Sequence, residues 1–184
     1  MTQFTEELEL LRQKIAMPTE TTFFRRDYDI ANETRIKQEI QKCLEYYESN
    51  GDAVTLFKNI SHILETDVKY LADLNQESDA YLPLLLTLRE KLVVSLIRKL
   101  NLNMRDQQDA SLIIRELVAI YNYLQNHFKN PDWFDNPQAY ETTQLSNFRI
   151  LAEIDEQSWG AEVRNRANIL RDGAGAPPQD ERIS

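Results

Sequence analysis

The stretch Leu82–Leu100, LPLLLTLREKLVVSLIRKL, is the most apolar segment of this 184-residue chain. At about 100° per residue, its apolar side chains cover one broad side of a helix. An arc this wide is typical of a helix that other helices surround. Arg89, Glu90 and Lys91 interrupt the run, whereas a membrane-spanning helix needs roughly 20 apolar residues. We therefore expect a central helix at about residues 80–101 and no membrane insertion.

Helical spacing of apolar residues continues on both sides of this segment, at about 3–16, 29–49, 53–74, 106–129 and 143–157. Only four glycines and six prolines occur, which disfavours a many-turned β fold. The inward residues expected on the helix at 143–157 are Leu145, Phe148, Leu151, Ala152 and Ile154. Ser158 can start a final helix that carries Trp159, Val163 and Leu170. We predict an all-α bundle of about six helices in one domain, residues 1–172, with a disordered tail, residues 173–184.

Charge and cysteine content limit the partners and the compartment. The formal net charge is −9, so phosphate backbones should be repelled, and a nucleic-acid-binding regulator is a disfavoured alternative. Four arginines concentrate in the last third of the chain, and we interpret them as a solvated helical face: Arg149, Arg164, Arg166 and Arg171. The single cysteine, Cys43, permits no internal disulfide. A chain of this kind fits the reducing cytoplasm.

The search for catalytic residues finds no recognisable site. His62 and His127 have no second histidine or cysteine at ligand spacing, so we expect neither a zinc site nor another cofactor. Glu45 and Glu48 form one helical pair of carboxylates, and Glu153 and Glu156 form another. If all four faced one cleft, they could hold Mg²⁺ through oxygen ligands. Some all-α nucleotide pyrophosphohydrolases use this chemistry, so a metal-dependent hydrolase is the main alternative function.

Two aromatic segments are candidates for contact with a partner. The connector at residues 17–28 carries Phe23 and Phe24 beside Arg25 and Arg26. The loop at residues 131–137 carries Trp133 and Phe134 between two prolines. Large aromatic side chains on such segments either fill the core or anchor a partner. The sequence leaves both interpretations open, and the core interpretation is the simpler one for each segment.

One pair of charges falls where apolar residues are expected. Arg89 lies within the apolar arc of the central helix, and Asp67 lies within the arc of the preceding helix. If the two helices form an antiparallel hairpin, both residues lie at nearly the same level, within about 3 Å. We expect a buried, charge-assisted pair, with an Arg89 that reaches solvent as the alternative.

By elimination, the sequence indicates a non-catalytic helical protein that works by binding another protein or a second copy of itself. Such a protein could be an adaptor, a regulator or an assembly subunit. Helical bundles with wide apolar faces and no site residues often complete their burial with a partner.

Overall fold

The computed structural model describes residues 4–19, 26–78, 81–126 and 137–175, and this part of the chain holds seven α-helices and no strand. The prediction of an all-α fold is confirmed, and the helix expected to restart at Ser158 is the seventh. The helices are α1 (Thr5–Ala16), α2 (Asp27–Asn50), α3 (Ala53–Ser78), α4 (Tyr81–Leu102), α5 (Gln107–Asn126), α6 (Pro137–Asp155) and α7 (Gly160–Gly175). Residues 173–175, assigned to the tail from the sequence, therefore belong to α7, and residues 176–184 lie outside the described part.

Local signals explain where several helices begin and end. Gly51 adopts a φ of 63° after α2 and donates its N–H to the Tyr47 carbonyl. Few residues other than glycine accept this left-handed conformation. Asp52 then accepts hydrogen bonds from the N–H and hydroxyl of Thr55, at 3.2 and 2.6 Å, which hold the pKa of its carboxyl below the ordinary value. Helix α6 begins six residues earlier than predicted, at Pro137, because proline is well tolerated at a first helical position.

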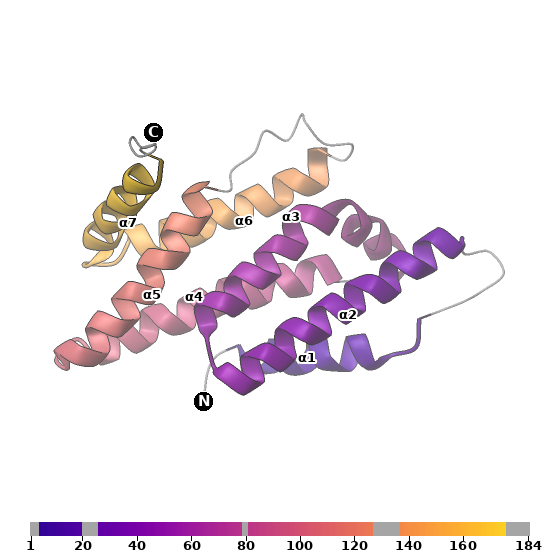
Figure 1. The fold of residues 1–184 in the computed structure, drawn as a ribbon, viewed down its shortest axis with the longest axis horizontal. Coiled ribbons are helices and arrows are strands. Elements are labelled where there is room, and N and C mark those ends of the chain that lie inside the picture. Colours follow the sequence, from indigo (N-terminus) through magenta and orange to yellow (C-terminus); the bar gives the residue numbers. More distant parts are fainter. Residues whose placement is uncertain (1–3, 20–25, 79–80, 127–136, 176–184) are drawn as a thin grey trace.

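The helices surround α4 as the sequence predicted. Helices α1 and α2 lie along one edge, α3 and α4 cross the middle, and α5 and α7 pack together at the opposite end (Figure 1). Helix α6 contacts α3, α4 and α7. Eleven residues of α4 are buried, including Leu85, Leu88 and Leu100, none of which is exposed. No helix in the described ranges is long and apolar enough to cross a membrane.

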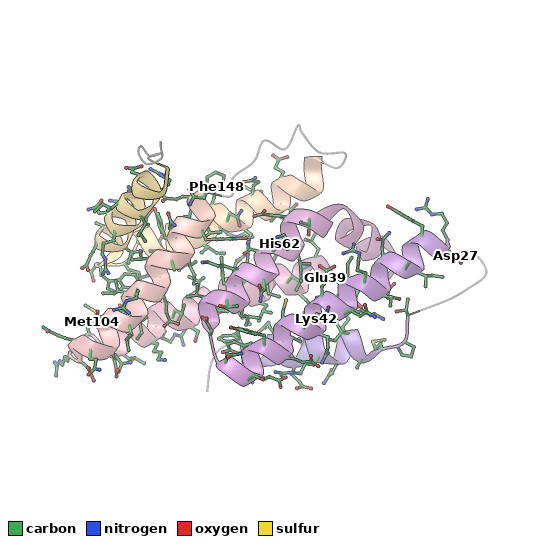
Figure 2. The ribbon with its side chains drawn as sticks, in the orientation of Figure 1. Asp27, Glu39, Lys42, His62, Met104 and Phe148 are labelled. Carbon is green, nitrogen blue, oxygen red and sulfur yellow. The ribbon has the colours of Figure 1, made fainter. Side chains whose placement is uncertain are left out.

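Helix α6 does not present the face that the sequence predicted. Ile150 and Ile154 are buried, but Leu145 and Phe148 are 55% and 56% exposed, and Phe148 appears at the upper surface of the molecule in Figure 2. Ala152 is also exposed, and Leu151 is half-buried. The inward positions of the first turns hold polar residues instead: Thr143, Gln144, Ser146 and Asn147. The prediction was wrong at these positions, and at one of them the physical reason is clear: the Ser146 hydroxyl accepts a hydrogen bond from the buried guanidinium of Arg89 on α4, which needs polar partners.

Candidate functional site

The C-terminal helix α7 is fixed against α5 by specific contacts. Trp159 is buried just before α7, and its indole N–H donates to Asn101 Oδ1 at 2.7 Å. Gly160 lies so close to the Ile154 carbonyl that an added Cβ would be 2.2 Å from the oxygen. On the facing helix, the Gln125 amide donates to Asn168 Oδ1 at 3.0 Å. The turn between α6 and α7 therefore permits only glycine at position 160 and sets the position of α7.

A second set of contacts joins α5 and α7 through the end of α6. The Tyr121 hydroxyl lies 3.1 Å from both oxygens of the Asp155 carboxylate, and Arg164 donates to the same carboxylate at 3.0 Å. Burial and the negative charge of Asp155 raise the pKa of Tyr121 to about 12. These three residues come from three elements, so they hold the arrangement of α5 and α7 together.

An open groove of about 460 Å³ runs between α5 and α7, and we call it the α5–α7 groove. Its apolar wall on α7 is formed by Ile169 and Leu170, which are 70% and 52% exposed. Val118 and Ala119 contribute from α5, and Val118 is itself buried. Leu112, 49% exposed, lies two turns before Ala119 on the same side of α5. Single exposed apolar residues are ordinary, but a group of them along one groove is a candidate binding surface.

Of the three apolar residues that the sequence places on the final helix, Trp159 and Val163 are buried, whereas Leu170 is 52% exposed. Val163 and Ala167, neither of them exposed, occupy the inner face of α7 with Trp159 before them. Alanine at position 167 lets the two helices approach closely, and the larger side chains that follow then lie outside the contact. Apolar spacing alone did not separate Leu170 from the inner residues of α7, so the groove was not predicted from the sequence.

The charged residues of the groove are both arginines. Arg115 projects from α5 and Arg166 from α7, and among the described residues no carboxylate lines the groove. Arg166 donates to Glu162 Oε2 at 3.4 Å in an exposed pair, which contributes little to stability. Arg115 has no ion pair with any described residue. The groove is thus locally positive on a chain whose formal net charge is −9.

The most unusual buried group is Arg89, which is 2% exposed. Its guanidinium donates to Ser61 Oγ at 3.0 Å and to Ser146 Oγ at 3.3 Å, and it lies 5.4 Å from the centre of the Phe57 ring. Ser146 in turn donates to Glu90 Oε2 at 2.7 Å. Burial lowers the pKa of Arg89 to about 10. The alternative in which Arg89 reaches solvent is therefore wrong, and the residue joins α3, α4 and α6.

The pairing of Arg89 with Asp67 stays a prediction, because the side chain of Asp67 lies outside the described residues. Ser61, the partner found on α3, precedes Asp67 by six residues, or about 9 Å along a straight helix. The C-terminal part of α3 bends away from its first part in Figure 1. The expected alignment of Asp67 with Arg89 along the helix axes rests on two straight helices, so it does not account for Ser61 as a partner of Arg89.

The four carboxylates of the metal alternative do not meet. Glu45 and Glu48 are exposed on α2, where Glu48 pairs with Arg12 at 3.1 Å. Among the described residues, helix α2 makes no contact with α6, which carries Glu153 and is followed directly by Glu156. The latter two line a separate groove of about 270 Å³ between α4 and α6. Within the described ranges, no three histidine, cysteine or acidic residues are grouped so that they could hold a metal ion.

The aromatic candidates from the sequence remain untested. Phe23, Phe24 and Arg25, like Trp133 and Phe134, lie outside the described residues. Arg26 is exposed immediately before α2.

Comparison with known proteins provides no assignment for the chain: no protein-family model, no curated protein and no solved structure matches it. A functional conclusion therefore depends on the geometry described above.

Proposed function

We propose that this protein is a non-catalytic binding protein that recognises another protein through the α5–α7 groove. The observation that supports this proposal is the exposure of Ile169 and Leu170 beside an open groove of about 460 Å³. A soluble chain keeps large apolar side chains in such a position at a cost, since each would release roughly 1.5–3 kcal/mol if it were covered. A partner that covers the groove recovers this energy.

The geometry of α7 favours a preformed surface. Contacts from Trp159, Gly160 and Asn168 fix the helix, so the groove walls do not have to order when a partner arrives. A preorganised surface loses less conformational entropy on binding. The cytoplasm remains the proposed compartment, on the grounds of the single cysteine.

Affinity capture from extracts of the producing cells tests this proposal. Ile169→Glu places a charge in the groove at an exposed position, so the fold should be retained, which circular dichroism checks. Leu10→Glu makes the same change at an exposed residue of α1, outside the groove. We expect proteins captured by the wild type and by Leu10→Glu to be lost with Ile169→Glu. Recovery of the same proteins by all three would contradict the proposal.

A second copy of the chain is the other occupant to consider. Sedimentation of the purified protein over a range of concentrations detects it. Self-association that Ile169→Glu abolishes would make the protein a homo-oligomer through this groove.

A further inference from the structure

We infer that the occupant of the α5–α7 groove is an acidic amphipathic helix of a partner protein. This inference rests on the proposed function, because it names the class of segment that the groove binds. It is carried by the combination of apolar walls with two arginines, Arg115 and Arg166, in a lining whose described residues include no carboxylate.

The apolar part of the groove fits a helix face. Its walls are themselves two packed helices, and a third helix can lay apolar side chains at i, i+3, i+4 and i+7 between them. Ile169 and Leu170 on one side and Val118 and Ala119 on the other provide apolar contacts for such side chains. An extended strand would need unpaired backbone groups on the receptor, and helices α5 and α7 have theirs bonded internally.

The two arginines of the groove determine which charge a bound helix should carry. Arg115 and Arg166 lie on opposite walls, so an incoming helix meets a guanidinium on each side. Arg115 has no ion pair among the described residues, and Arg166 has only its exposed contact with Glu162. A carboxylate on each flank of the incoming helix would pair with them in charge-assisted hydrogen bonds. A helix with lysines on its flanks would be repelled.

The same charges disfavour a symmetric dimer of this chain. In a two-fold dimer, the same surface meets itself. Arg115 and Arg166 of both copies would then lie in one interface, and among the described residues the groove lining provides no carboxylate for them. Arginines also attract the phosphates of a nucleic acid. A nucleic acid, however, has no apolar side chains to cover the apolar walls of the groove, and the net charge of −9 repels it. Both are outcomes that the experiment below distinguishes.

A display library of helical peptides of about 15 residues provides the test. Each peptide carries apolar residues at one helical face and random residues on the flanks. The library is selected on the full chain, and peptides that also bind the uncharged variant Ile169→Ser are discarded. We expect the remaining peptides to be enriched in Asp and Glu beside the apolar face. Labelled winners are then titrated by fluorescence anisotropy.

Single charge reversals identify which arginines are responsible. Arg115→Glu and Arg166→Glu should each weaken the binding of an acidic peptide by about tenfold. Arg105→Glu makes the same change in the exposed turn before α5, outside the groove, and should change the affinity by less than about twofold. Selection on the Arg115→Glu, Arg166→Glu double variant should enrich lysine and arginine instead.

Each other outcome overturns a defined part of the inference. Groove-dependent peptides that are neutral or basic would leave the groove as a binding site and refute the acidic class. Equal effects of Arg105→Glu and Arg115→Glu would do the same, since net charge alone would then explain them. If no peptide depends on Ile169, the proposed function fails with the inference. Ile183 lies among residues 176–184, outside the described part of the chain. If peptides bind the Ile183→Glu variant of the full chain but not the wild type, this segment of the chain itself is the occupant. Self-association lost with Ile169→Glu would assign the groove to a second copy.

Discussion

Replacement of Arg89 tests how a bundle holds a buried charge on hydroxyl groups. Burial lowers the pKa of Arg89 from its ordinary value to about 10. At about 1.4 kcal/mol per pKa unit, the folded protein holds the charge at a cost of about 3 kcal/mol. Because the pKa is lower in the folded state, this cost applies at every pH below about 10 and is relieved only as the pH rises above 10 toward the ordinary pKa of arginine. The contacts with Ser61 and Ser146 offset it, at about 1.5 kcal/mol each.

Two substitutions separate the charge from the volume. Arg89→Met removes the charge and its cost together with the two hydrogen bonds, while it keeps most of the side-chain volume. We expect its free energy of unfolding to lie within about 1 kcal/mol of the wild type, as for other buried charges replaced by apolar residues. Arg89→Ala also leaves a cavity and should be less stable than Arg89→Met by about 2–5 kcal/mol. Urea denaturation followed by circular dichroism measures both free energies of unfolding. An unchanged slope of this free energy against urea concentration shows that the variants expose the same surface area on unfolding.

A loss of about 3 kcal/mol or more in Arg89→Met would refute this reasoning. It would mean that the guanidinium has a carboxylate partner whose removal leaves an unpaired buried charge. Asp67→Asn then becomes the decisive variant. If Asp67 is that partner, the variant should lose a similar amount, and the double variant should lose much less than the sum of the two.

Three further predictions concern residues that fix the fold. Gly160→Ala should lower the free energy of unfolding, measured by urea denaturation, by about 1–3 kcal/mol or more, because its Cβ meets the Ile154 carbonyl. A stability equal to that of the wild type would contradict the tight turn. Tyr121 should ionise near pH 12 when tyrosinate absorbance is followed in the native state, and Tyr121→Phe should remove that step. Because folding raises the pKa of Tyr121 from 10, its contribution to stability is complete below pH 10. This contribution is lost between about pH 10 and 12. Cys43 should resist alkylation at pH 8 until the protein unfolds, because burial raises its pKa to about 11, and rapid labelling of the native protein would show that the site opens.

The sequence was sufficient for the architecture because helical periodicity and turn residues act locally. Leu82–Leu100 is long and apolar enough to require surrounding helices, and Asn50-Gly51-Asp52 contains both the end of one helix and the cap of the next. These features depend only on neighbouring residues, and the structure retains them.

The candidate site could not be predicted in the same way, because it depends on which helices meet. Leu170 and Leu145 have the spacing of core residues, yet both are exposed, since Ala167 and Ser146 provide the inward contacts at those levels. A small residue that allows close approach and a hydroxyl that faces Arg89 carry no periodic apolar signal. Arg115 becomes part of the groove only because α7 packs beside α5.

Photo-cross-linking from position 169 tests the central claim most directly. A photoreactive residue in place of Ile169, in the intact protein inside the cells that make it, lies on the wall of the α5–α7 groove, whereas one in place of Leu10 lies on α1. The account predicts a discrete adduct with another protein from position 169 and no such adduct from position 10. Absence of an adduct at position 169, or the same adduct from both positions, would contradict it.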